Sequence, residues 1–157
     1  MFYYNQYIRA KSLEEAYELY QKRQNFIVGG MLWTKMKNTT LGTAIDLCEL
    51  GLDGIEENEN EFRIGAYVSL RDIETNESLN KYTDNAFANS VKDIVGVQFR
   101  NVATVGGSIW GRYGFSDVMT IFRALGAKVE LFHEAIMELD DFVKLPRTVR
   151  DILVSVI

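Results

Sequence analysis

Two Gly-Gly pairs, each placed after a short apolar run, restrict the fold of this chain more than any other feature. The first pair lies in FIVGGMLWTKM at residues 26–36, and the second lies in NVATVGGSIWG at residues 101–111. A helix-compatible run follows each pair. Glycine permits positive φ and close backbone approach, so both pairs predict tight turns whose successive N–H groups form a concave anion site. Two such sites that face each other could hold a diphosphate.

The two turns match neither of the common phosphate-binding fingerprints. G-x-G-x-x-G and G-x-x-x-x-G-K-[ST] are both absent, which argues against a Rossmann motif and a P-loop. A Gly-Gly pair alone is weak evidence because tight turns of many kinds use it. The residues by themselves therefore predict a dinucleotide or phosphate site and no more specific ligand.

Around these turns, short strands alternate with helices, which predicts an α+β fold made of α/β lobes. Ser12 and Ser69 are expected N-caps, and Phe87, Val91 and Val95 are expected on one buried helix face. Expected strands span residues 6–9, 26–28, 44–47, 128–132 and 151–157, and a hairpin is expected over 55–64. Expected helices span residues 13–24, 84–95 and 117–125, and a further short helix begins at residue 69. The acidic segment 49–61, which contains no base, marks the expected boundary between lobes 1–54 and 55–157.

Charge and hydropathy exclude several classes of protein. The 157 residues are 47% hydrophobic, enough for one core or two small lobes. Because 22 acids stand against 17 bases, a general nucleic-acid binder is excluded. No apolar run approaches the roughly 18 residues of a membrane span, and the N-terminus lacks a signal-peptide layout. We therefore expect a cytoplasmic protein with no membrane insertion.

The cysteine and histidine counts limit the chemistry that this chain can perform alone. A single cysteine, Cys48, excludes an internal disulfide framework, a cysteine-rich zinc site and an iron–sulfur cluster held by this chain alone. A lone histidine, His133, makes a histidine-based metal site equally unexpected, so we assign no metal ligand and no catalytic side chain. Cys48 is expected as a buried core thiol on a strand, and His133 as a surface or partly buried residue. Redox chemistry would then need a bound organic cofactor or a partner chain.

A longer segment around the second turn is similar to a known family. QFRNVATVGGSI at 98–109 resembles the second flavin-binding signature, Q-I-R-N-x-A-T-I-G-G-N, of the FAD-binding medium subunits of molybdenum hydroxylases. These are proteins of the xanthine dehydrogenase and carbon monoxide dehydrogenase type. The first turn resembles the family's A-G-G-T-[DN]-L loop, and RIGAYVSLRDIE at 63–74 resembles its intervening I-G-A-x-T segment. Asp117, GAKVEL at 126–131 and RDILVSVI at 150–157 fit the family pattern in order and spacing, so the resemblance spans essentially the whole chain.

The resemblance implies a two-lobed FAD-binding domain of the type shared with vanillyl-alcohol oxidase, with the FAD diphosphate between the two glycine loops. It also implies partners on separate chains. A molybdenum-cofactor subunit oxidises the substrate, an iron–sulfur subunit relays the electrons to FAD, and FAD delivers them to NAD or another acceptor. The flavin performs the redox step while the protein supplies binding and orientation.

The family pattern also implies which residues contact the cofactor. Backbone N–H groups of the first loop and hydroxyls of the second would bind the diphosphate, Ser116 and Asp117 would face the adenosine or ribityl part, and three apolar side chains would flank the cofactor. The first loop comprises Ile27, Val28, Gly29, Gly30, Met31, Leu32 and Trp33; the second comprises Ala103, Thr104, Gly106, Gly107 and Ser108; the apolar residues are Ile94, Ile152 and Leu153.

Several positions depart from the family pattern. Met31 and Leu32 stand where Thr and Asp or Asn are usual, so the first loop loses polar side chains. The stretch Arg112-Tyr113-Gly114-Phe115 replaces the usual small residues and Pro before the Asp. Arg112 could lie near a phosphate or be solvated, and we expect it to be solvated. The family's C-terminal domain, which helps to cover the flavin, has no counterpart in this sequence. Trp33 and Trp110 could stack on a cofactor ring or pack between the lobes.

These departures leave two other hypotheses open. One is a non-catalytic interaction protein that keeps the fold but binds FAD weakly or not at all. The other is an unrelated nucleotide-binding module, which the long match at 98–109 disfavours.

Overall fold

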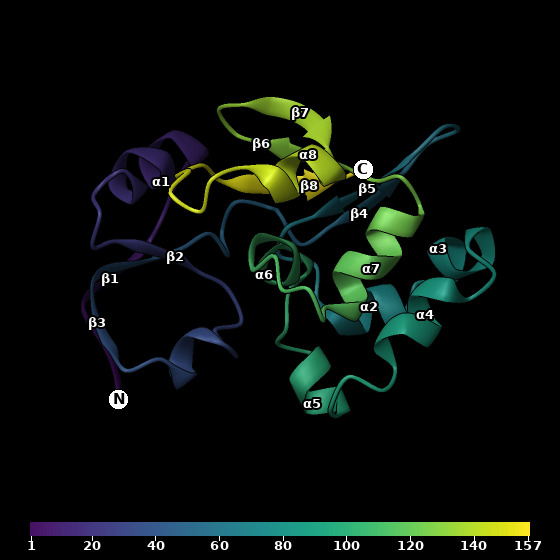
Figure 1. Ribbon diagram of the computed structural model, residues 1–157, viewed down its shortest axis with the longest axis horizontal. Helices are drawn as coiled ribbons and strands as arrows, with labels where there is room; N and C mark the ends of the chain where they lie inside the picture. Colours follow the sequence, from purple (N-terminus) through teal and green to yellow (C-terminus); the bar gives the residue numbers. More distant parts are fainter.

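The computed structural model describes residues 1–157, and its first unit is a small parallel sheet covered by one helix (Figure 1). The strand order is β1-β3-β2, formed by β1 (Phe2–Arg9), β3 (Thr39–Asp46) and β2 (Phe26–Val28). Helix α1 (Leu13–Tyr20) connects β1 to β2, and the 3₁₀ turn η1 (Thr34–Met36) lies between β2 and β3. The first glycine pair therefore follows the carboxyl end of an outer strand of this sheet.

The second unit is built on an antiparallel sheet of five strands in the order β4-β5-β8-β6-β7. These are β4 (Ile55–Glu57), β5 (Phe62–Gly65), β8 (Leu153–Val156), β6 (Lys128–Leu131) and β7 (Ala135–Glu138). The last strand in the sequence occupies the centre of the sheet. The segment that leads into it, residues 145–152, consequently passes between the two units.

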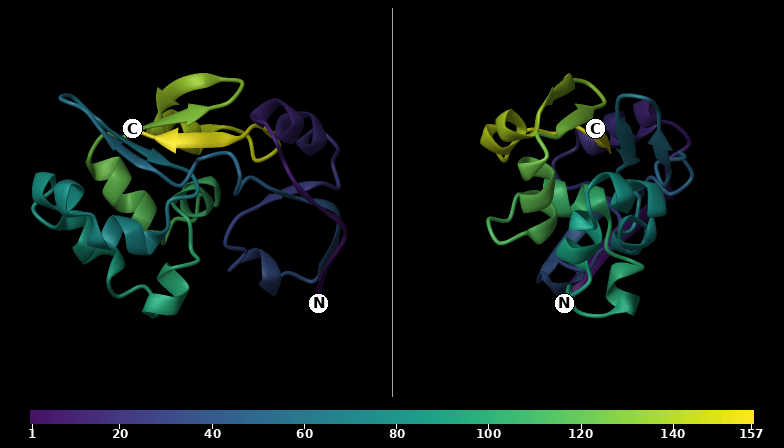
Figure 2. Two further views of the ribbon diagram at one scale, coloured as in Figure 1. Left: turned by 180° about the vertical axis from the view of Figure 1, so that it is seen from behind. Right: turned by 90° about the vertical axis from the view of Figure 1, so that its right-hand side faces the viewer.

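Seven helices belong to the second unit (Figure 2). They are α2 (Leu70–Thr75), α3 (Glu77–Tyr82), α4 (Ala86–Val91), α5 (Val97–Arg100), α6 (Val105–Trp110), α7 (Asp117–Ala124) and α8 (Leu139–Lys144). Helix α6 packs on β5 and β8, while α4 packs on both α2 and α7. None of the helices combines the length and the apolar character that crossing a membrane requires.

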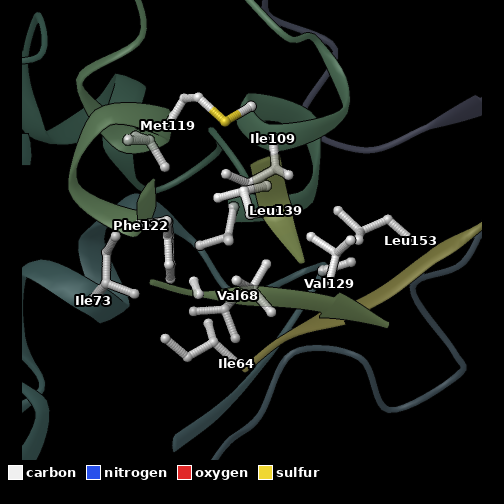
Figure 3. Packing of buried hydrophobic residues seen from close by; sticks show 14 of the residues in the cluster. Ile64, Val68, Ile73, Ile109, Met119, Phe122, Val129, Leu139 and Leu153 are labelled. Atoms are coloured by element: carbon white, nitrogen blue, oxygen red, sulfur yellow. The ribbon is translucent and has the colours of Figure 1, made fainter. Parts of the chain in front are cut away.

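Two hydrophobic cores stabilise these units. The larger core lies between the five-stranded sheet and its helices and includes Ile109, Phe122 and Val129 (Figure 3). The smaller core packs Ala16 of α1 against Ile45 of β3. Ile152 completes this smaller core, whereas its neighbour Leu153 belongs to the larger one, because successive side chains of an extended chain point in opposite directions. One dipeptide thus joins the two cores.

Most of the expected elements are confirmed, including the mixed α and β architecture. The Ser12 hydroxyl accepts from the Glu15 N–H at 3.1 Å. Ser69 and Asp72 form a complete capping box at the start of α2. The hairpin, the strand at 26–28 and the helix beginning at Asp117 lie where the pattern predicts them.

Two helices are shorter than predicted. Helix α1 ends at Tyr20 and not near residue 24, because the Arg150 guanidinium binds carbonyl oxygens of Tyr20, Lys22 and Asn25. The predicted helix over 84–95 is helical only over Ala86–Val91. Val95 has a φ of +52° and is 79% exposed, so its placement on a buried helix face is wrong.

The expectation for Cys48 is also wrong, because this residue is exposed. Strand β3 ends at Asp46, and the Asp46 carboxylate accepts from the Cys48 N–H at 3.0 Å, which turns the chain away from the sheet. His133 is exposed, as expected, and stacks on Tyr17 with a centroid distance of 5.2 Å.

Candidate functional site

A cleft of about 550 Å³ lies between the two units. This volume is in the usual range for sites that bind small molecules and cofactors. Its walls come from the first glycine loop, from α6 and the segment after it, and from the segment that leads into β8. Of the predicted site residues, the cleft is lined by Ile27, Gly29, Gly30, Met31, Leu32, Trp33, Ile94, Ala103, Thr104, Gly106, Gly107, Ser108, Ser116, Asp117, Ile152 and Leu153. Val28 is buried and does not line it.

The first glycine loop, residues 29–33, presents free backbone donors. None of its five N–H groups donates to an acceptor within the protein. Met31 has a φ of +56°, which turns the backbone sharply after the glycine pair. The three-residue turn η1 follows and not the helix that the sequence suggested. This loop can therefore offer several successive N–H groups to an anionic ligand.

The second glycine loop, residues 103–108, has a different structure because its N–H groups, except that of Thr104, already donate within the protein. Thr104 is the N-cap of α6, and its Oγ1 accepts from the Gly107 N–H at 3.1 Å. The N–H groups of Val105 and Gly106 donate to the carbonyls of Val68 and Ala66 at 2.9 and 2.8 Å. The Ser108 hydroxyl donates to the Thr104 carbonyl at 2.9 Å. The second loop is thus fixed to the sheet of its own unit.

The two loops approach each other closely, and this approach requires glycine. A Cβ atom added to Gly30 would lie 1.8 Å from the Val102 carbonyl oxygen. A Cβ atom on Gly29 would lie 3.2 Å from Thr104 Oγ1. The first loop therefore rests on residues 102–104, and the free N–H groups lie beside the Thr104 hydroxyl at the start of α6.

Tyr67 connects the two units beneath the first loop. Its hydroxyl accepts from the Leu47 N–H at 2.9 Å, and its hydrogen lies between the Val28 carbonyl and Asp46 Oδ1. The second oxygen of Asp46 accepts from the Tyr7 hydroxyl at 2.5 Å. Burial raises the pKa of Tyr67, so the phenol stays protonated. The hydrogen bond to the Val28 carbonyl holds the end of β2 immediately before the first loop. Val28 thus anchors this loop without lining the cleft.

Ser116 and Asp117 lie at the start of α7. The Ser116 hydroxyl accepts from the Met119 N–H at 3.1 Å and caps this helix. Asp117 is exposed, and its carboxylate takes part in no ion pair. It is available to accept hydrogen bonds from ligand hydroxyls.

An aromatic cluster connects the first loop with the segment after α6. The Trp33 ring lies 5.4 Å from Tyr113 and 5.9 Å from Phe115, measured between centroids. Trp33 remains 48% exposed and Phe115 69% exposed. Trp110 instead packs on Phe142 at 5.5 Å. Both tryptophans line the cleft, so they pack against the protein and also lie next to any ligand bound there.

Arg112 is buried, and the expectation that it is solvated is wrong. Its guanidinium carbon lies 4.2 Å from the centroid of Phe142, and Nη1 donates to the Leu145 carbonyl at 2.6 Å. Both partners lie more than 25 positions away along the chain, so no local pattern predicts them. Sequence reasoning also missed other residues of the cleft wall, namely Tyr20, Tyr67, Arg147 and Arg150. The only one of these features visible in the sequence is the pair of arginines in PRTVR at residues 146–150.

Comparisons with known proteins identify the family of this chain. Residues 3–157 match a family model described as the FAD binding domain in molybdopterin dehydrogenase. The chain is 26% identical over 145 residues to YgfM, an uncharacterized protein of Escherichia coli (strain K12), covering 90% of this chain and 54% of YgfM.

Solved structures share the fold. The cyanide-inactivated form of Cu,Mo-CO dehydrogenase superposes with a TM-score of 0.85 at 24% identity, covering 98% of this chain and 58% of that one. Quinoline 2-oxidoreductase from Pseudomonas putida 86 also superposes with a TM-score of 0.85, at 18% identity over 99% of this chain and 58% of its own. The chain therefore spans little more than half the length of these relatives. Because the family model covers nearly every residue, the chain belongs to the family of FAD-binding domains of molybdopterin dehydrogenases, whose cofactor is FAD.

Proposed function

We propose that this chain is the flavin-carrying component of a xanthine dehydrogenase-like molybdenum hydroxylase. In this proposal a molybdenum-cofactor subunit oxidises the substrate and an iron–sulfur subunit on a separate chain passes the electrons to FAD. FAD then delivers them to NAD or another acceptor. The family of this domain supports the proposal, and so do its structural neighbours, a Cu,Mo-CO dehydrogenase and a quinoline 2-oxidoreductase.

One observation carries the binding part of the proposal: the five free N–H groups of residues 29–33 lie against the start of α6 in a cleft large enough for a dinucleotide. A diphosphate is the part of FAD that most needs successive backbone donors. These donors do not depend on side chains. The apolar Met31 and Leu32 are therefore compatible with binding.

The other residues of the cleft then have separable tasks. The Thr104 hydroxyl, which accepts from Gly107, keeps its own hydrogen for a phosphate oxygen. Asp117 accepts hydrogen bonds from ribose or ribityl hydroxyls, while Ile94, Ile152 and Leu153 exclude water from the flanks. Bound FAD supplies reversible two-electron transfer, and the chain holds and orients it.

We further propose that residues 1–54 and 55–157 are two lobes that hold the cofactor between them. The two sheets, which use strands before residue 47 and after residue 54, support this division. We place the complex in the cytoplasm, since the exposed, unpaired Cys48 suits a reducing compartment.

The test is the UV–visible spectrum of the purified protein, followed by titration of the apoprotein with FAD while flavin and tryptophan fluorescence are recorded. We expect saturable one-to-one uptake of FAD. FMN, which lacks the diphosphate, should bind at least about tenfold more weakly, a difference of about 1.4 kcal/mol. Absence of FAD uptake would contradict the proposal and favour the non-catalytic interaction protein. Bound FAD that no iron–sulfur partner reduces would contradict the electron-transfer part alone.

A further inference from the structure

Three arginines of the cleft wall lack a carboxylate partner. Arg112, Arg147 and Arg150 form no ion pair, although the protein carries a net charge of −5. Five other arginines pair with aspartate or glutamate, namely Arg9, Arg63, Arg71, Arg100 and Arg123. The remaining arginine, Arg23, is exposed and does not line the cleft. Positive charge without a counter-charge is thus concentrated at the cleft.

Arg112 is the most unusual of the three. It is 8% exposed, and its Nε is the one buried side-chain nitrogen or oxygen in the structure without a hydrogen-bond partner. Burial and the neighbouring charge of Arg147 both lower the pKa of Arg112, so the fold disfavours its charge. A buried cation without a partner destabilises a protein unless something supplies negative charge or an acceptor. The Leu145 carbonyl accepts from Nη1 and the Phe142 ring lies against the guanidinium, but no carboxylate pairs with Arg112 and its Nε has no acceptor.

The carboxylate nearest to this cluster in the sequence is directed elsewhere. Asp151 accepts from the N–H groups of His133, Glu134 and Ile152 and from none of the arginines. Tyr20, which lies under the Arg150 guanidinium at 4.1 Å, has a pKa raised by burial and stays neutral. Backbone carbonyls accept from all three arginines, so what the cluster lacks is a negative charge and, at Arg112 Nε, one acceptor. A ligand in the cleft can supply both.

Helix α6 separates the arginine cluster from the diphosphate loops. Thr104 begins this helix beside the first loop, whereas Arg147 donates to the carbonyls of Gly111 and Arg112 just after its end, at 2.7 and 2.9 Å. At 1.5 Å per residue, the helix is about 9 Å long. A ribityl chain covers a comparable distance between the diphosphate and the flavin ring. The rings of Tyr20 and Trp110 also line the cleft, with Arg150 over Tyr20 at 4.1 Å and Arg112 over Trp110 at 5.5 Å.

We propose that Arg112, Arg147 and Arg150 form a subsite for the pyrimidine edge of the flavin ring and bind its reduced, anionic form more tightly than its oxidised form. This inference rests on the proposed function. Reduction adds two electrons and one proton to the neutral ring; the proton goes to N5, and negative charge remains at N1 and the C2 carbonyl. Cations beside that edge stabilise only the reduced form, and charge near N1 is an established way in which proteins tune flavins.

The experiment compares the two-electron potential of bound FAD in the wild type and in four variants, by anaerobic reduction with dithionite against a reference dye. Arg112→Gln removes the charge, and Arg112→Lys retains it. Arg147→Gln removes a second positive charge of the cluster, at an exposed position where a substitution should leave the protein folded. Arg23→Gln changes the net charge equally but lies outside the cleft. Circular dichroism verifies that each variant is folded.

We expect Arg112→Gln to weaken binding of reduced FAD at least about tenfold more than binding of oxidised FAD, which lowers the potential by about 30 mV. Arg147→Gln should lower the potential by a smaller amount. The potentials of Arg112→Lys and Arg23→Gln should stay close to that of the wild type. An unchanged potential in both glutamine variants would overturn the inference. An equal loss of affinity for the two redox forms would overturn it as well. If the wild type takes up no FAD, the proposed function itself fails.

Discussion

The two glycine loops have nearly the same sequence pattern and opposite states of hydrogen bonding. In residues 29–33 all five N–H groups are free, whereas in the second loop the N–H groups of residues 105–107 bond within the protein. The difference has two sources: the carbonyls of Val68 and Ala66 accept from Val105 and Gly106, and the Thr104 hydroxyl accepts from Gly107, whereas the first loop has no comparable acceptors. A Gly-Gly pair thus defines how sharply the chain turns, and its neighbours decide whether the donors remain available.

This difference assigns different tasks to the loops. The second loop is a fixed wall, anchored through the carbonyls of Ala66 and Val68 to its own sheet. The first loop presents donors, and it is positioned from outside by Val102 below it and by Tyr67 at its base. The comparison predicts that a charge added to the wall harms binding most. Separation of the loops should harm it less, and loss of the Tyr67 anchor least.

The largest effect is expected from Gly107→Asp, which adds a negative charge to the wall beside the diphosphate. Two like charges about 4 Å apart repel by about 4 kcal/mol near a protein surface, so FAD binding should fall below detection. The protein should stay folded because Gly107 is exposed. Gly114→Asp is the control, since a side chain there meets nothing within 4 Å and the position lies outside the cleft wall. Unchanged FAD affinity of folded Gly107→Asp in calorimetry would disprove the assignment of this wall to the diphosphate.

A smaller effect is expected from Gly30→Ala, which separates the two loops. Its Cβ would overlap the Val102 carbonyl, and such overpacking costs about 1–3 kcal/mol, partly as stability and partly as FAD affinity. Gly114→Ala is the matched control because a Cβ there meets nothing within 4 Å and the position lies outside the cleft wall. Equal FAD affinities of the two variants would show that the approach of the loops does not matter for binding.

The sequence predicts the local features of this site well. Ser12 and Ser69 begin helices as predicted, because polar residues that precede apolar helical patterns are recognisable without a structure. The glycine loops and Asp117 were found through an ordered motif, and the structure brings them to one cleft. Short-range geometry and family pattern were sufficient for these residues.

The long-range contacts could not be predicted in the same way. Tyr67 bonds to Val28, which lies 39 positions away, and Arg150 binds the end of α1 across 130 positions. Such pairs depend on how the two units pack, and no periodicity in the chain records that packing. Arg112 was misjudged for this reason, because the aromatic ring that covers it belongs to α8.

The smallest effect is expected from Tyr67→Phe, which removes the anchor below the first loop and leaves the glycines intact. Loss of the bonds to Val28 and Leu47 should lower the free energy of unfolding by about 1–3 kcal/mol near neutral pH and weaken FAD binding a few-fold. Tyr82→Phe, at a tyrosine that is 74% exposed, is the control and should change neither.

The same variant has a pH signature that tests the burial of the phenol. Because the pKa of Tyr67 is raised in the folded state, its contribution to stability is complete below the unfolded pKa of about 10 and is lost as the pH rises above it. The wild type should therefore lose up to about 1.4 kcal/mol more per pH unit above pH 10 than Tyr67→Phe does. Urea unfolding at about pH 8 and about pH 11 measures this difference. A constant gap between the two proteins would mean that the Tyr67 hydroxyl is open to solvent, and the first loop would then lack the anchor that distinguishes it from the second.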